Sequence, residues 1–226
     1  MKASNKSKVV LAALTAALLG VSTISAVGAE SAASIAKKGL AELAKGVYST
    51  GPNGETAAPA ASLTFTSAEL AKLKGMNATA AIAFHLTSDW TSGQQAGLTK
   101  RFGELGIKIV GVTQADFKAD VQVSQIQTLM AKKPNILVSI PVDGQATAEA
   151  YKAAAAAGAK IVFMDNTAAG LTVGKDYVSV VSADNYANGA ASAYILGREL
   201  NGKGTIALIH HAAPAPCVEL HTSKRQ

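Results

Sequence analysis

The chain has 226 residues, 49% of them hydrophobic, and carries 21 lysine and arginine residues against 15 aspartate and glutamate residues, a formal net charge of +6. That length suits one large domain, or one domain with part of another. Three of the basic residues lie in the first eight positions, and the remaining balance gives no argument for binding nucleic acid. Cys217 is the only cysteine, which excludes an internal disulfide.

The first 29 residues are typical of a cleavable signal peptide. Lysines precede an uncharged run over residues 9–29, and Val27 and Ala29 are small residues at the positions that a signal peptidase reads. We therefore predict cleavage before Glu30 and a soluble protein in a periplasm-like space. A retained membrane anchor is the alternative, because the run is about long enough to span a bilayer. Several polar and glycine residues interrupt the run, which favours cleavage.

Residues 30–77 are expected to form a mobile leader with helical patches. One such helix is predicted over residues 67–74, with Ser67 as its N-cap and with Leu70 and Leu73 on one face. The leader contains few long apolar runs, so we place the main domain after it.

From residue 78 the chain repeats one unit, in which a short apolar run leads into a polar cluster and then into a helical stretch. Apolar runs predict buried strands at 79–86, 108–112, 136–140, 160–164 and 177–181, and a sixth at 205–209. Helical patterns cover 93–105, 121–132, 145–157 and 186–200. This alternation predicts an α/β fold, a doubly wound parallel sheet in the order 2-1-3-4-5.

Polar residues follow four of the predicted strands in a recognisable order. They are Leu86–Trp90 after the first strand, Ile140–Asp143 after the third, Phe163–Asn166 after the fourth and Ser182–Asn185 after the fifth. On these landmarks the chain resembles the type I periplasmic sugar-binding proteins, the ribose-binding-like receptors of ABC importers, over about residues 85–213. The carboxyl ends of parallel strands meet at one crevice, where such receptors bind their ligand.

The resemblance implies ligand-binding roles for Trp90 and Asp165. Trp90 would stack on the apolar C–H face of a sugar, and Asp165 would accept hydrogen bonds from two neighbouring hydroxyls. The alternatives are that Trp90 is a core or surface residue and that Asp165 only closes a turn. Asn166 stands where ribose receptors usually carry arginine, which argues for another sugar, a polyol or a related small solute.

Three further candidates are Ser88, Asp89 and Asp143. Ser88 and Asp89 flank the tryptophan and could hydrogen-bond sugar hydroxyls, although Asp89 could instead cap the following helix. Asp143 either caps the next helix or lines the cleft. The pair Asp184–Asn185 is expected near the hinge between lobes, where structural and ligand-facing roles both stay open.

No metal, cofactor or enzymatic activity is predicted. His210 and His211 are adjacent on a predicted strand and so point to opposite faces, which disfavours joint chelation. His85 is interpreted as a packed strand-end residue. The sequence lacks a dinucleotide-binding glycine motif after the first strand, a phosphate loop, a nucleophile elbow and a His-Glu-x-x-His motif. A repressor sharing this core would need a DNA-binding motif where the export signal lies.

The resemblance also implies two lobes. Residues 78–201 are predicted to form the N-terminal lobe and residues 202–213 the first strand of the second lobe. Residues 214–226 lack the expected helical pattern, which predicts a truncated copy with an aberrant tail, for example after a frameshift. The predicted function is capture of a sugar or polyol by a monomeric binding protein for the permease of an ABC importer. A periplasmic sensor for a membrane receptor and an uncharacterised α/β enzyme are the alternatives.

Overall fold

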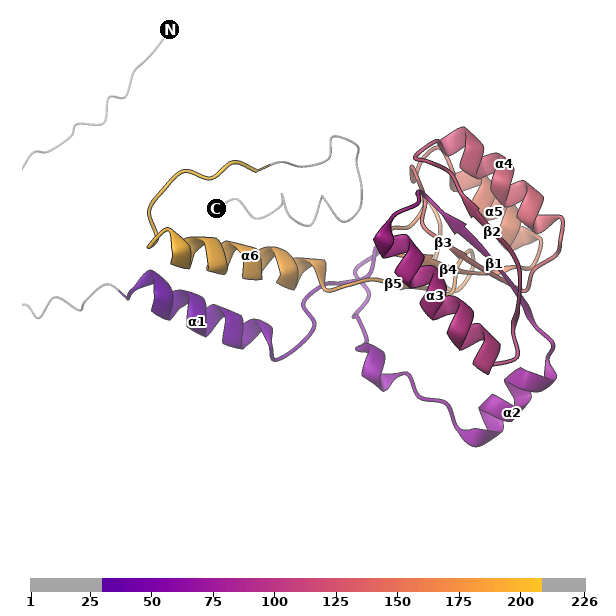
Figure 1. Cartoon of the computed structure of the whole chain (residues 1–226), viewed down its shortest axis with the longest axis horizontal. Helices are drawn as coiled ribbons and strands as arrows, with labels where there is room; N and C mark the ends of the chain where they lie inside the picture. The colour runs from indigo at the N-terminus through magenta and orange to yellow at the C-terminus, as the bar shows by residue number, and fades with distance from the viewer. Residues whose placement is uncertain (1–29, 209–226) are drawn as a thin grey trace, which may run out of the picture.

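The structure, a computed structural model, describes residues 30–208. These residues form a parallel sheet with helices on both faces, and a pair of helices, α1 (Ala32–Leu43) and α6 (Asn185–Glu199), that extends away from the sheet (Figure 1). Within this described range no helix is both long and apolar enough to cross a membrane. The predicted signal peptide and the tail from residue 214 lie outside the described residues, as do His210, His211 and Cys217.

Five strands and five further helices make up the rest. The strands are β1 (Thr79–Phe84), β2 (Lys108–Gln114), β3 (Ile136–Ser139), β4 (Lys160–Met164) and β5 (Ser179–Val181). The helices are η1, a short 3-10 helix (Ala60–Ser62), α2 (Ser67–Gly75), α3 (Asp89–Glu104), α4 (Ala119–Met130) and α5 (Ala148–Ala156). The strand order is β2-β1-β3-β4-β5 and every pair is parallel, which confirms the predicted doubly wound fold.

The interior strand β1 is buried on both faces. Every side chain from Ala80 to Phe84 is 0% exposed. Alternate residues point to opposite faces of a strand, so Ala81 and Ala83 join the core under α4 and α5, whereas Ile82 and Phe84 join the core under α3. Such burial on both sides explains why the strand is apolar throughout.

A buried glutamine fixes the loop that follows β3. Gln122 of α4 is fully buried, and its Nε2 donates a hydrogen bond to the carbonyl oxygen of Ile140 at 2.8 Å. Its Oε1 accepts one from the backbone N–H of Val142 at 2.7 Å. Both polar atoms of the side chain are thereby satisfied inside the fold, and the loop that carries Asp143 is tied to a neighbouring helix.

Two sequence predictions are wrong in detail. Thr66, not Ser67, is the N-cap of α2, because the Thr66 side chain and the Glu69 side chain each accept a hydrogen bond from the other residue's backbone N–H. The sixth strand is not formed over residues 205–208. A strand needs a neighbour for its backbone groups, and α6 carries the chain away from the sheet before this segment begins (Figure 1).

The helix α1, which was not specifically predicted from the sequence, packs against α6 through a glycine. Gly39 is buried, and the ring of Tyr194 covers it so closely that a Cβ at position 39 would lie 2.2 Å from the Tyr194 Cζ. Ala36, one turn earlier, is also buried at 1% exposed. Small residues on α1 therefore allow the two helices to approach each other closely.

Replacing Gly39 with alanine should loosen the α1–α6 pair. The new methyl group would overlap the Tyr194 ring, and such overpacking costs about 1–3 kcal/mol, against a gain of roughly 1 kcal/mol from helix propensity. Hydrogen exchange of the α1 amides should become faster. Gly197→Ala in α6 is the matched control, since nothing lies within 4 Å of a Cβ there, and it should not speed exchange. Equal exchange in the two variants would contradict this packing.

Candidate functional site

The carboxyl ends of the strands form an exposed edge, here called the carboxyl edge, where Asp165 is held from two sides. Asp165 follows β4, and its Oδ1 accepts a hydrogen bond from the Ser182 hydroxyl, after β5, at 2.9 Å. The Asp165 backbone N–H donates to the carbonyl oxygen of Val181 at 2.8 Å. Asn185 donates from Nδ2 to the Ser182 hydroxyl at 3.1 Å. These contacts fix the position of the Asp165 carboxylate.

The backbone at Asp165 is strained, and its carboxylate is open to solvent. Its φ of +66° lies in the left-handed region, which aspartate and asparagine tolerate better than most residues. The side chain is exposed, and Oδ2 has no hydrogen-bond partner among the residues that the structure describes. One oxygen is thus held by the protein while the other can accept a hydrogen bond from a ligand.

His85 follows β1 and packs against Phe117 from the loop after β2. The two rings meet edge to face, with centroids 5.2 Å apart, and the Phe117 backbone N–H donates to the His85 carbonyl oxygen at 2.8 Å. Burial lowers the pKa of His85, although the Asp165 carboxylate opposes this shift, so the imidazole is neutral at neutral pH. Its Nδ1 is buried without a hydrogen-bond partner among the described residues. These contacts agree with the predicted packing role.

Trp90 lies in the first turn of α3 and is 50% exposed, which excludes the core role that was one alternative for it. The preceding turn is fixed by a capping box. The Ser88 hydroxyl accepts a hydrogen bond from the Thr91 backbone N–H at 3.2 Å, and the Thr91 hydroxyl accepts one from the Ser88 backbone N–H at 2.8 Å. Ser88 therefore caps α3, and Asp89 is not the N-cap but the exposed first residue of the helix.

Asp143 has the capping role that the sequence left open, although it caps the turn before α5 rather than the helix itself. Its Oδ1 accepts hydrogen bonds from the backbone N–H groups of Gln145 and Ala146, both at 2.8 Å. Thr147 is the N-cap residue of α5. Asn166 is half-buried beside Asp165, and its backbone N–H donates to the Met164 carbonyl oxygen at 2.8 Å.

Asp184 is an anchor between distant parts of the chain. Its carboxylate accepts hydrogen bonds from the backbone N–H groups of Tyr48, Ser49 and Ala187 at 2.7, 3.1 and 3.0 Å, and from the Ser49 hydroxyl at 2.8 Å. Burial by itself would raise the pKa of Asp184, but these hydrogen bonds outweigh it and lower the pKa. The carboxylate joins the leader to the start of α6, a structural role.

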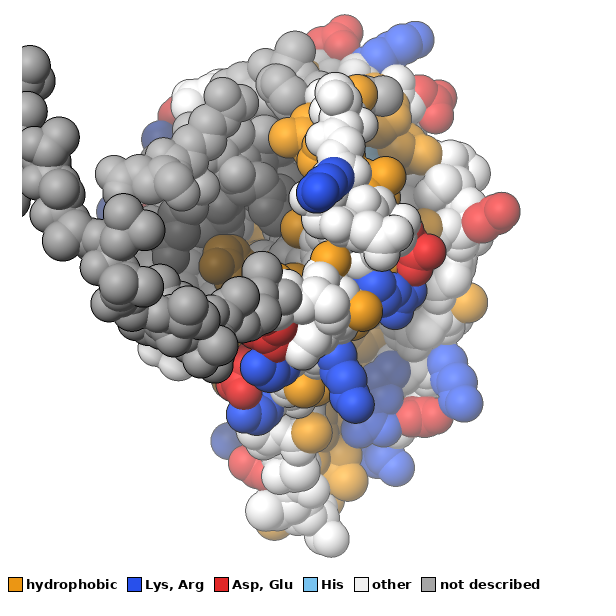
Figure 2. Space-filling view, turned by 90° about the vertical axis from the view of Figure 1, so that its left-hand side faces the viewer, with side chains coloured by type: hydrophobic (Ala, Val, Ile, Leu, Met, Phe, Trp, Pro, Cys, Tyr) orange, Lys and Arg blue, Asp and Glu red, His pale blue; other side chains and the backbone are white. Residues whose placement is uncertain are grey.

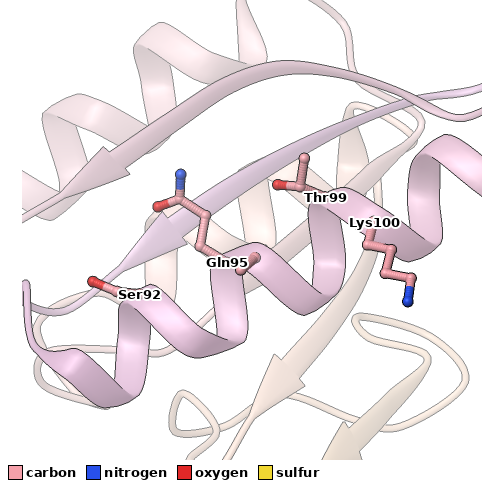
Figure 3. A pocket seen from close by; sticks show the side chains of 5 residues that line it. Ser92, Gln95, Thr99 and Lys100 are labelled. Atoms are coloured by element: carbon pink, nitrogen blue, oxygen red, sulfur yellow. The ribbon is translucent and has the colours of Figure 1, made fainter.

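A hollow of about 510 Å³ lies beside α3 rather than at the carboxyl edge (Figure 3). It is lined by Ser92, Gln95, Ala96, Thr99 and Lys100. All of these residues belong to one helix, and none of the predicted ligand residues is among them. In the described part of the chain no three His, Cys, Asp or Glu side chains are grouped to hold a metal ion. The carboxyl edge therefore remains the better candidate site.

Comparison with protein families supports this assignment of the fold. The sequence profile of the periplasmic binding protein domain matches residues 80–219. The chain belongs to this family of binding proteins. A search of curated proteins found no match.

Three solved structures of the family share the fold. A galactofuranose binding protein has a TM-score of 0.56 and 18% identity, covering 64% of this chain and 49% of its own. An ABC sugar transporter subunit from Rhodobacter sphaeroides 2.4.1 has a TM-score of 0.54 and 23% identity, covering 63% and 49%. An ABC transporter solute binding protein from Agrobacterium vitis, bound with α-D-tagatopyranose, has a TM-score of 0.51 and 25% identity, covering 56% and 45%. The chain of this protein thus spans less than half the length of each of these three relatives.

Replacing Asp184 with alanine should destabilise the junction of the leader with α6. Loss of an N-cap costs about 0.5–2 kcal/mol. Because the pKa of Asp184 is lowered in the folded chain, its stabilising effect is present above the ordinary carboxyl pKa and is lost as the pH falls through the lowered value. In urea unfolding, the difference between wild type and variant should be full at neutral pH and should shrink below about pH 4.

The matched control is Asp176→Ala, because the Asp176 carboxylate accepts one backbone hydrogen bond, from Thr172 at 2.8 Å. Its destabilisation at neutral pH should be smaller than that of Asp184→Ala. A difference for Asp184→Ala that stays constant into acid would show that the carboxylate charge is not responsible.

Proposed function

We propose that this chain binds a neutral sugar or polyol at its carboxyl edge, as part of an exported substrate-binding protein of an ABC importer. The observation that carries the proposal is the Asp165 carboxylate, which is positioned by Ser182 and the backbone of Val181 while its second oxygen is exposed. A charged acceptor that the protein already holds in position can accept a hydrogen bond from a ligand hydroxyl. Binding then does not include the free-energy cost of ordering that side chain.

The half-exposed indole of Trp90 supplies the second element that a sugar needs. Sugar rings have an apolar C–H face, and an aromatic plane covers that face while polar groups hold the hydroxyl rim. Asp89 and Asn166 lie next to these two residues in the sequence and complete the proposed ligand set. Ser88 and Asp143 contribute indirectly, because their side-chain oxygens cap the turns that carry the site.

The related structures support the class of ligand and partner. The Agrobacterium vitis relative is an ABC transporter protein with a bound hexose, and another relative is a galactofuranose binding protein. The predicted signal peptide agrees with an exported receptor that delivers its solute to a membrane permease. Binding would be reversible capture with no covalent step. We propose that the carboxyl edge forms one side of a site whose closure involves a facing lobe, as in hinged binding proteins.

Tryptophan fluorescence tests the proposal directly, because Trp90 is the only tryptophan in the chain. Titration with a panel of pentoses, hexoses and polyols should give a saturable change with at least one solute. Asp165→Asn should weaken that binding about tenfold to a hundredfold, the loss expected for a hydrogen bond to a charged acceptor. A folded sample that responds to no member of the panel would contradict the proposal.

Asp116→Asn is the matched control for the Asp165 variant. Asp116 follows β2, is exposed and also has a positive φ, +48°, so both substitutions remove one charge at a left-handed position that asparagine tolerates. The control should bind like the wild type. Equal weakening in both variants would point to the overall charge of the edge rather than to Asp165.

Trp90→Ala should weaken binding of the same solute by at least about tenfold, because it removes the stacking surface as well as apolar contact area. The variant has no tryptophan, so isothermal titration calorimetry would measure its affinity. Trp90→Phe keeps an aromatic plane and should retain most of the affinity. An unchanged dissociation constant in Trp90→Ala would remove the tryptophan from the proposed site.

A further inference from the structure

The opposite edge of the sheet, where the strands begin, carries a concentration of positive charge. We name this set the basic edge: Lys72, Lys74, Lys100, Arg101, Lys108, Lys132, Lys133 and Lys160, all of them exposed. They come from the C-terminal parts of α2 and α3, from the turn after α4 and from the first residues of β2 and β4. Figure 2 views the molecule from the α1–α6 end, where Lys and Arg side chains are intermixed with Asp and Glu side chains over the lower part.

Strand register and packing bring these segments together. Lys108 pairs with Thr79, and Lys160 pairs with Ile136, which in turn pairs with Ala80, so the two lysines lie in neighbouring rows at the start of the sheet. Lys132 reaches β2, where its Nζ donates to the Val110 carbonyl oxygen at 2.8 Å. The helix α2 lies beside the turn between α3 and β2, since its Leu70 and Leu73 pack with Leu105 and Ile107.

Two acidic residues, Glu69 and Glu104, lie on the same two helices near these segments, and both are engaged locally. Glu69 accepts hydrogen bonds from the backbone N–H and hydroxyl of Thr66 at 2.8 and 2.9 Å. Glu104 forms an ion pair with Arg101 at 2.8 Å. The basic edge therefore keeps a strong excess of positive charge, carried by long side chains at its surface.

The carboxyl edge has the opposite charge. Within five residues of its carboxyl end each strand is followed by one aspartate, and these are Asp89, Asp116, Asp143, Asp165 and Asp184. Lys118 is the one lysine or arginine in the same five windows, which also contain the neutral His85. The α/β lobe is thus electrically polarised, with the proposed sugar site on its negative edge.

We propose that the basic edge docks the protein on an anionic phospholipid surface. Its ammonium groups come from several elements and are spread over an edge, an arrangement that suits a surface of distributed negative charge better than a single anion. A lipid surface is favoured because the predicted signal peptide directs the chain to a space bounded by a membrane. In this orientation the carboxyl edge points away from the bilayer and takes up solute from solvent through Trp90 and Asp165, so delivery to a permease requires release from the lipid surface first.

Vesicle co-sedimentation with the full chain tests the docking. The chain should sediment with vesicles of phosphatidylglycerol and phosphatidylcholine at low ionic strength, and it should be released as salt is added because surface charges are screened. A triple variant that combines Lys74→Gln, Lys108→Gln and Lys160→Gln should bind the vesicles roughly a hundredfold more weakly. Each lysine near an anionic surface raises the affinity about fivefold. These three lysines make no ion pair or side-chain hydrogen bond with other described residues.

The matched control is a second triple variant, which combines Lys37→Gln, Lys118→Gln and Lys203→Gln. It loses the same charge from exposed positions outside the basic edge. It should keep the binding of the wild type. Both variants retain residues 1–29, so any contribution of that segment is common to them. Equal binding of the two variants, or equal binding to pure phosphatidylcholine vesicles, would overturn the proposal, and so would tighter binding to duplex DNA than to vesicles. The test uses no sugar, so its outcome is independent of the proposed sugar site.

Discussion

The burial of β1 on both faces is the constraint on which the rest of the structure depends. The side chains from Ala80 to Phe84 are wholly inaccessible, so helices must cover each face of the sheet, with α3 on one side and α4 and α5 on the other. Because all the strands are parallel, their carboxyl ends lie on one edge of the sheet. The interior strands can then present polar groups to solvent only at their ends. The charged residues therefore gather at the carboxyl edge and at the basic edge.

The carboxyl edge is pre-organised by hydrogen bonds that belong to the fold. Asp165 adopts a left-handed φ, an arrangement with a conformational cost, and contacts with Ser182 and the Val181 carbonyl hold it there. Gln122 does the same for the loop after β3 from inside the core. Because these loops are ordered by the protein itself, a ligand would lose less free energy in ordering them.

The sequence predicted the strands and their order because each buried strand is a short apolar run bounded by a glycine, a proline or a polar cluster. It did not predict the link between Asp184 and Tyr48, which are separated by 136 positions, since no local pattern reports such a contact. The close approach of Gly39 to Tyr194 was missed for the same reason. The prediction of a sixth strand was wrong because an apolar run forms a strand only where a neighbouring strand can pair with it. At the site, the resemblance selected Trp90 and Asp165, whereas the capping roles of Ser88 and Asp143 depend on backbone geometry that their residue types leave open.

The polarity of the lobe also bears on which solutes the carboxyl edge accepts. Helix N-termini favour aspartate and helix C-termini favour lysine, so a doubly wound lobe tends toward one acidic and one basic edge. Five aspartates at the acidic edge, with the uncharged Asn166 beside Asp165, create a negative potential that repels anionic ligands at distances within the Debye length of about 8–10 Å. A neutral hydroxylated solute meets no such repulsion, and its hydroxyl groups can donate hydrogen bonds to the Asp165 carboxylate. For the proposed site, this potential favours free sugars and polyols over their phosphates.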